Sequence, residues 1–332
     1  MNDGLSPLPH EFCARLEQIV PAEALPQVLR SFENVRPASF RVNTLLSGTE
    51  ESFAELRNGG LAVTDCAWCD VAGTVPAEQR RQLSEHVAVT EGRVYIQGLS
   101  SMLAALALAP QPGEAVLDLA AAPGGKTLHL AATMQKQGRL SAVEPVRTRF
   151  FKLRENLRRY GADDFVRLYQ TDGRDVGRKT PETFDAVLLD APCTSEARFD
   201  CNDPTSWQFW GPRKIAESAR KQKALLRSAI DATRVGGRVL YCTCSFAPEE
   251  NELVVAHTLR RLEGKITLLR IELPVGNIQP GLTQWEGKEL PSEVALARRV
   301  LPDETMSGFF LALVEKTEPT ALTKQKRGRH RE

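Results

Sequence analysis

The sequence DLAAAPGGKT at residues 118–127 decides the fold, because it joins two different patterns. The short apolar run EAVL at 114–117 comes before it, and the stretch 124–138 has the apolar spacing of a helix. This order predicts a strand, a glycine turn and a helix. A phosphate-binding P-loop needs a glycine five positions before Gly125, but that position is Ala120. The turn therefore favours a nucleotide-like ligand other than ATP or GTP.

The same alternation continues toward the end of the chain. Further strands are expected at 139–144, 165–170, 184–192 and 236–245, helices at 147–161, 212–234 and 249–262, and a closing edge strand at 308–316. Strands that alternate with helices at this spacing form a sheet of parallel strands with helices on both faces. We therefore predict an α/β fold with a doubly wound, mostly parallel sheet.

The first part of the chain has a different pattern. Residues 1–92 contain two helical stretches and then a strand, a helix and a strand, which indicate a smaller α+β domain. We expect a second domain at 93–317. The remaining residues, 318–332, form a basic tail that we expect to be disordered. This tail either contacts phosphates or only keeps the protein in solution.

The composition predicts a soluble protein. Of the 332 residues, 42% are hydrophobic, which is enough for a packed core, and the net charge of +1 gives no sign of a preferred partner. The longest apolar run, at 102–109, is far shorter than the roughly 20 residues that cross a bilayer. Seven cysteines are an odd number, which does not favour a disulfide framework. We expect a cytoplasmic location, no membrane contact and a monomeric protein.

Acidic residues end the first three strands of the predicted sheet. Asp118 ends the first strand, Glu144 the second, and Asp172 follows the third. Ligands of such sheets bind beyond the carboxyl ends of the strands, where a carboxylate accepts hydrogen bonds from ribose hydroxyls. Three acids without a phosphate clamp fit S-adenosylmethionine better than ATP, with Lys126 near its carboxylate. A glycine turn alone is also typical of a tight connection between a strand and a helix. Lys126 is also compatible with an exposed position on the helix that follows.

Two cysteines follow the next two strands. Asp190 and Cys193 come after the fourth strand, and Cys244 comes after the fifth. Because these strands open onto the same crevice, the carboxylate and both thiols should converge there. A buried structural cysteine is the common alternative for one thiol. Two thiols at neighbouring strand ends instead indicate a catalytic site.

A thiolate beside a methyl donor suits methylation at carbon 5 of a pyrimidine. This carbon is a poor nucleophile until a thiolate adds to carbon 6. The helix expected after Cys244 would favour the thiolate. Asp190 would stabilise the base at its N3 edge. The second thiol would help to remove the carbon 5 proton or to release the product.

The other cysteines carry less information. We expect Cys242 to face away from Cys244. Cys66 and Cys69 form a C-x-x-C pair without the second pair that a zinc site needs, so we predict no metal. His129 lies inside a predicted helix and is expected in the core or on the surface.

Five segments resemble the Sun-type RNA cytosine-C5 methyltransferases, also called the Nop/Sun family, which are class I enzymes dependent on S-adenosylmethionine. The segments are FRVNT at 40–44, DLAAAPGGKT at 118–127, DAPCTSE at 190–196, YCTCSFAPEENE at 241–252 and GFFLALVEK at 308–316. The resemblance covers about residues 35 to 315. It implies a seven-stranded Rossmann-like methyltransferase sheet with a small N-terminal RNA-recognition domain.

The resemblance also assigns roles. It implies that Cys244 is the nucleophile, that Cys193 serves product release, and that Asp190 is the catalytic acidic residue, which also lines the cofactor site. The implied S-adenosylmethionine site consists of Ala120, Ala121, Ala122, Pro123, Gly124, Gly125, Lys126, Glu144, Arg149, Asp172 and Asp190. Many relatives read S-x-x-G after the first of the two cysteines, whereas this chain has Thr194, Ser195, Glu196, Ala197 and Arg198.

The expected substrate is a cytosine in structured RNA, either rRNA or tRNA, because the base must leave its stack to reach a thiol. Candidate RNA contacts are Arg41, Asn43 and Arg198, with Arg80, Arg81, Arg298, Arg299 and the tail as further candidates. Each arginine is also compatible with a solvated surface position. The alternative function is a non-catalytic RNA-binding ribosome-assembly factor that retains the fold. Methylation of a protein or small molecule would leave the two thiols unexplained.

Overall fold

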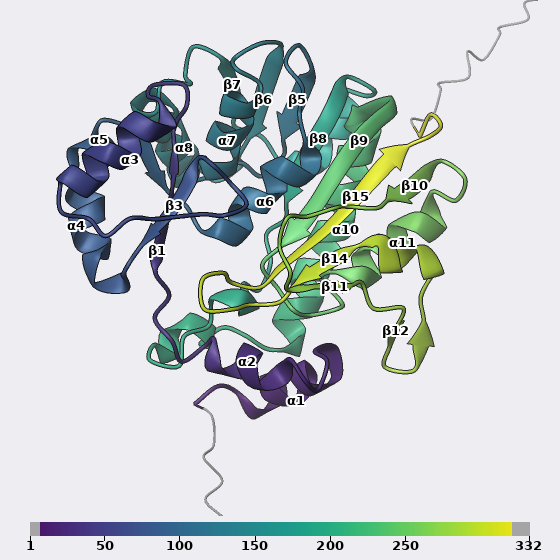
Figure 1. Ribbon diagram of the computed structural model, residues 1–332. Helices are drawn as coiled ribbons and strands as arrows, with labels where there is room; N and C mark the ends of the chain where they lie inside the picture. The colour runs from purple at the N-terminus through teal and green to yellow at the C-terminus, as the bar shows by residue number, and fades with distance from the viewer. Residues whose placement is uncertain (1–6, 321–332) are drawn as a thin grey trace, which may run out of the picture.

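The computed structural model describes residues 7–320, and its main feature there is a nine-stranded mixed sheet (Figure 1). Five neighbouring strands are parallel, in the order β7, β6, β5, β8, β9. They are β5 (Ala115–Asp118), β6 (Arg139–Val143), β7 (Val166–Tyr169), β8 (Phe184–Asp190) and β9 (Thr233–Thr243). The chain runs from β5 outward through β6 to β7 and then returns to the other side of β5 to form β8. The strand order therefore reverses between the neighbouring strands β5 and β8. Such a switch point leaves a crevice at the carboxyl ends of the strands.

Antiparallel strands complete the sheet on the β9 side. They are β10 (Ile266–Leu269), β11 (Ile278–Pro280), β14 (Arg298–Val300) and β15 (Phe309–Lys316). β15 pairs with β9 on one side and with both β10 and β14 on the other, so it is an interior strand and not the predicted edge strand. The predicted fold class is confirmed, but the short strands β11 and β14 raise the implied seven strands to nine. A separate hairpin pairs β12 (Gln284–Trp285) with β13 (Lys288–Glu289).

Helices cover both faces of the sheet, as predicted. One face packs against α6 (Leu99–Leu108), α7 (Gly125–Thr133) and α8 (Arg147–Arg159), and the other against α10 (Pro212–Ala232) and α11 (Glu252–Arg261). Side chains alternate between the faces along each strand. Val116 therefore packs toward α6 and α7, while Leu117 packs toward α10. A short helix, α9 (Val176–Lys179), follows β7.

The small N-terminal sheet has four antiparallel strands in the order β2, β3, β1, β4. They are β1 (Ala38–Val42), β2 (Thr64–Asp65), β3 (Ala72–Val75) and β4 (Val94–Ile96). Its core also includes residues of α3 (Thr49–Asn58), α4 (Arg80–Glu85) and α5 (Val87–Thr90). This sheet continues to Ile96, slightly beyond the expected boundary at residue 92.

The first two helices belong to a different core. α1 (His10–Ile19) and α2 (Leu25–Arg30) lie below the large sheet in Figure 1, away from the small sheet. Phe12 of α1 packs against Phe199 and Phe246, with ring centroids 4.8 and 6.4 Å away. These helices therefore support the loops that follow β8 and β9. None of the helices in residues 7–320 has the length and hydropathy that a membrane crossing requires. The segment 321–332, which holds most of the basic tail, lies outside the described residues.

Candidate active site

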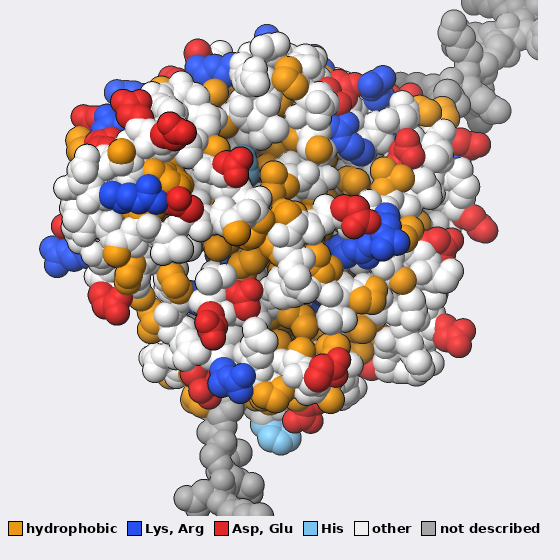
Figure 2. All heavy atoms as spheres, viewed as in Figure 1, with side chains coloured by type: hydrophobic (Ala, Val, Ile, Leu, Met, Phe, Trp, Pro, Cys, Tyr) orange, Lys and Arg blue, Asp and Glu red, His pale blue; other side chains and the backbone are white. Residues whose placement is uncertain are grey.

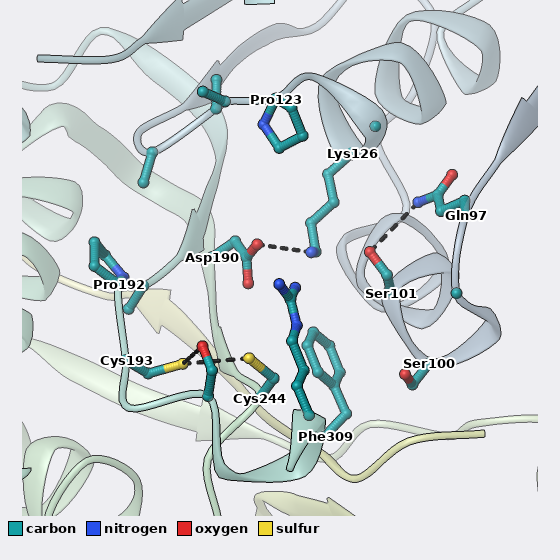
Figure 3. A pocket seen from close by; sticks show the side chains of 18 of the residues that line it. Gln97, Ser100, Ser101, Pro123, Lys126, Asp190, Pro192, Cys193, Cys244 and Phe309 are labelled. Carbon is teal, nitrogen blue, oxygen red and sulfur yellow. Dashed lines mark hydrogen bonds and ion pairs between the residues drawn. The ribbon is translucent and has the colours of Figure 1, made fainter. Parts of the chain in front are cut away.

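A cavity of about 570 Å³ lies at the carboxyl ends of β5, β8 and β9 (Figure 3). Its walls come from the glycine turn, from the loops after β8 and β9, and from the segment 95–101 that joins the two sheets. The space-filling view shows apolar side chains gathered in a hollow between the small sheet and the rest of the molecule (Figure 2). The site is thus enclosed by both parts of the chain.

The glycine turn forms one wall of this cavity. Ala120 to Pro123, Gly125 and Lys126 line it, and α7 begins at Gly125. Gly124 has a φ of 113°, which glycine adopts without strain. A Cβ on Gly125 would lie 2.9 Å from Cε1 of Tyr95, so glycine allows the small sheet to approach the turn. The turn therefore presents backbone groups to the cavity at the start of a helix.

Lys126 and Asp190 form an ion pair at the centre of the site. Lys126 Nζ lies 2.7 Å from Asp190 Oδ2, and it also lies 5.5 Å from the ring centre of Phe309 (Figure 3). Burial opposes the charge of Lys126, but Asp190 together with Cys242 and Cys244 outweighs burial, so the pKa of Lys126 is raised. The contact between Lys126 and a cofactor carboxylate stays a prediction, and Lys126 lines the cavity where such a ligand would lie.

The two cysteine thiols converge, as expected from their strand ends. Cys193 Sγ and Cys244 Sγ are 3.4 Å apart, and both residues line the cavity (Figure 3). The hydrogen bond with Cys193 and the charge of Arg198 together lower the pKa of Cys244 to about 6 against the effect of burial. The pKa of Cys193 rises well above its usual value because it donates that hydrogen bond and is buried. The nearby charge of Arg198 therefore favours Cys244 as the thiolate, with Cys193 as its protonated partner.

Cys242 does not face away from the site. Its Sγ lies 3.7 Å from Asp190 Oδ1, and burial raises its pKa well above the usual value. The prediction was wrong because side chains two positions apart on a strand share a face. Cys242 lies deeper along β9 than Cys244 and is fully buried.

The acids at the other strand ends differ in their surroundings. Asp118 lines the cavity, and burial raises its pKa to about 6; Thr127 Oγ1 donates to its Oδ2 at 2.7 Å. Glu144 is buried, accepts a hydrogen bond from the Val146 amide at 2.9 Å and lies 3.4 Å from Arg149.

Asp172 caps the short helix at Gly173–Asp175 by accepting from the Arg174 amide at 2.9 Å. Arg149 lines the cavity, where its guanidinium donates to the Ala122 carbonyl at 2.8 Å. Glu144 and Asp172 are not among the described residues that line it. The cofactor roles of both acids stay predictions.

Two of the three candidate RNA contacts lie inside the protein. Arg41 is 1% exposed, burial lowers its pKa to about 10, and its Nε donates to Gln97 Oε1 at 3.2 Å. Asn43 donates to the carbonyls of Gly92 and Tyr160, both at 2.9 Å. Both side chains are therefore buried and hydrogen-bonded within the protein. The segment FRVN at 40–43 is therefore a structural connection between the two parts of the chain.

The remaining candidate arginines also differ. Arg198 lines the same cavity as Cys244. Arg299 is buried and paired with Glu252 at 2.5 Å, and Arg298 is half-buried and donates to the Ile271 carbonyl at 3.0 Å. The exposed pair at positions 80 and 81 stays available for RNA phosphates.

Several residues that line the cavity were not predicted from the sequence. Tyr95, Gln97 and Ser101 come from the segment between the sheets, and Phe309 comes from the start of β15. None of them has a spacing pattern that marks chemistry. The apolar start of β15 and the polar residues after β4 acquire a role only when the fold brings them to the cavity.

Comparisons with known proteins agree with this arrangement. A family described as 16S rRNA methyltransferase RsmB/F matches residues 105–315. The chain is 32% identical to a ribosomal RNA small subunit methyltransferase F of Aliivibrio fischeri, over 96% of this chain and 66% of that protein. It is 33% identical to the human 28S rRNA (cytosine(4447)-C(5))-methyltransferase, over 91% of this chain and 37% of that one. A methyltransferase homologue from Pyrococcus horikoshii has a TM-score of 0.76 and 31% identity, with 93% of this chain and 100% of that chain covered.

Proposed function

The chain belongs to the RsmB/F family of S-adenosylmethionine-dependent RNA cytosine-C5 methyltransferases, and from this membership we propose that it methylates carbon 5 of a cytosine in structured RNA. The observation that carries the proposal is the pair of thiols 3.4 Å apart in a cavity that also contains Asp190. A protein that only binds RNA needs neither thiol. Because the curated relatives named above act on ribosomal RNA by name, rRNA is the substrate class that we propose first.

The cavity residues fit S-adenosylmethionine. Among the described residues, Asp118 Oδ1 is buried without a hydrogen-bond partner, although it lies beside the glycine turn in the cavity. Such an oxygen requires a donor, and an amino group of the ligand would supply it. Ala120 to Pro123 and Arg149 would hold the rest of the ligand, with Glu144 as the acceptor for ribose hydroxyls. When bound, S-adenosylmethionine supplies the electrophilic methyl group.

The protein's own groups account for activation of the base. The Cys244 thiolate forms a bond to carbon 6, and the electron pair of the ring double bond moves to make carbon 5 nucleophilic. The ion pair of Lys126 and Asp190 offers one donor and one acceptor, which match the acceptor N3 and the amino group of cytosine. After carbon 5 is methylated, its proton passes to a water molecule, the electron pair of that C–H bond restores the double bond between carbons 5 and 6, and the bond from carbon 6 to Cys244 breaks. Cys193 is placed to return a proton to the departing sulfur.

Methylation of isolated RNA tests this proposal. The protein is incubated with S-adenosylmethionine and with rRNA or tRNA from cells that lack the gene, and the digested nucleosides are analysed for 5-methylcytidine. We expect 5-methylcytidine in rRNA with the wild type and none with Cys244→Ser. Normal cofactor binding without methylation of either RNA class would contradict the proposal and favour the non-catalytic assembly factor. Light scattering of the same preparation checks the expected monomer.

A further inference from the structure

The loop Thr194–Arg198, which departs from the S-x-x-G pattern of many relatives, brings a guanidinium into the cavity that holds the proposed nucleophile. Arg198 lines the same cavity as Cys244, and its positive charge acts on the Cys244 thiol. We propose that Arg198 is a catalytic residue of this chain that holds Cys244 in its reactive, negatively charged form before RNA arrives. The consequence for methylation rests on the proposed function, whereas the contact with the sulfur does not.

The loop is fixed to the backbone around Cys244 by several hydrogen bonds. The Ala197 amide donates to the Cys244 carbonyl at 3.0 Å. The buried Glu196 carboxylate accepts from the amides of Phe246 and Ala247 at 2.7 and 2.8 Å. The same carboxylate group also accepts from Ser245 Oγ at 2.9 Å and from the indole of Trp210 at 2.7 Å. Arg198 therefore stands at a position set by the segment that carries the nucleophile.

Among the charged groups around Cys244, Arg198 is the one placed to stabilise a negative charge on its sulfur. The other ionisable groups that act on Cys244 or on its partner are Asp190 on β8, Lys126 on α7, Cys193 and Glu250. Asp190 raises the pKa of Cys244, and Lys126 is committed to Asp190 at 2.7 Å. Within residues 7–320 Arg198 forms no ion pair with a carboxylate at salt-bridge distance, and its charge lowers the pKa of Cys244.

The helix expected after Cys244 does not supply the positive charge. α11 begins only at Glu252, and two buried carboxylates, Glu196 and Glu250, accept hydrogen bonds from the amides of Phe246 and Thr194 in the two loops that carry the cysteines. Burial raises the pKa of Glu250 to about 7, which shows how strongly this region resists negative charge. A neighbouring cation is therefore needed to keep a thiolate at Cys244.

The pH dependence of alkylation measures the contact without RNA or turnover. The full chain is treated with iodoacetamide between pH 5.5 and 9.5, and modification at Cys244 is followed by peptide mass spectrometry. We compare the wild type with Arg198→Gln, Arg198→Met and the charge-retaining Arg198→Lys. Arg213→Gln is the control, since this exposed arginine on α10 does not line the cavity.

We expect Arg198→Gln and Arg198→Met to move the alkylation curve of Cys244 upward by about one pH unit or more, which is roughly a tenfold slower reaction near pH 6. Arg198→Lys keeps the charge and should shift the curve less than the two neutral variants do. Arg213→Gln should leave the curve unchanged. Curves of both neutral variants that superimpose on the wild type would overturn the inference. A shifted curve in a protein that methylates no RNA would uphold this role of Arg198 and overturn only the proposed function.

Discussion

Replacement of Asn43 tests whether the FRVN segment is a structural connection. Its side-chain amide is 1% exposed and donates to the carbonyls of Gly92 and Tyr160 at 2.9 Å, while its oxygen accepts from the Leu45 amide at 3.3 Å. Asn43→Ala removes these hydrogen bonds and leaves the carbonyl of Tyr160, at the end of α8, without this partner. Each lost bond costs about 1 kcal/mol, and stranded buried groups add to that cost. We expect the free energy of unfolding to fall by about 2–4 kcal/mol.

Chemical denaturation and RNA binding, measured on the same proteins, distinguish a structural role of Asn43 from the predicted contact with RNA. Asn43→Asp keeps the shape but replaces the donor by an oxygen, so it should destabilise the fold at least as much as Asn43→Ala at neutral pH. Arg81→Ala is the control, because this side chain is 86% exposed and should change stability by no more than about 0.5 kcal/mol. An Asn43→Ala protein of wild-type stability with weakened RNA binding would refute the reasoning.

Three further outcomes follow from the site and its supports. Methylation should stay near its maximum down to about pH 7 and fall as the pH drops through the lowered pKa of Cys244, and Cys193→Ala should move the acid limb of adduct formation to higher pH; a profile that still rises above pH 8 would contradict this. Glu144→Gln should weaken S-adenosylmethionine binding about tenfold or more in calorimetry, because a charged acceptor for the ribose is lost, while an unchanged affinity would exclude that role. Glu252→Ala should lower the unfolding free energy by about 3–5 kcal/mol, because it leaves the buried Arg299 unpaired, and a smaller loss of stability in the same denaturation assay would contradict it.

The parallel part of the sheet could be predicted because its strands are short apolar runs separated by helices. The antiparallel part could not, because β11 and β14 have three residues each and β11 ends in Pro280. β15 is an interior strand because other strands pair with both of its edges. The residues of β15 alone do not indicate this pairing.

The convergence of the two cysteines was predictable for the same reason as the sheet. Strand ends that open onto one crevice must bring Cys193 and Cys244 together. The burial of Arg41 could not be predicted, because an arginine in a sequence was taken to be exposed. All five residues of β1 are buried, and Arg41 meets Gln97 at 3.2 Å. The role of Arg198 also depends on a loop whose hydrogen bonds reach residues near Cys244.

The most direct test of the central claim is to identify which sulfur bonds to the RNA base. Cys193→Ala protein is incubated with S-adenosylmethionine and with unmethylated RNA of the class that the wild type methylates. The adduct is isolated under denaturing conditions, and the crosslinked peptide is sequenced by mass spectrometry. We predict that the base is attached to Cys244 and that the adduct is absent from the Cys193→Ala, Cys244→Ala protein. An adduct on any other residue, or one that persists in this double variant, would contradict the assignment of Cys244 as the nucleophile.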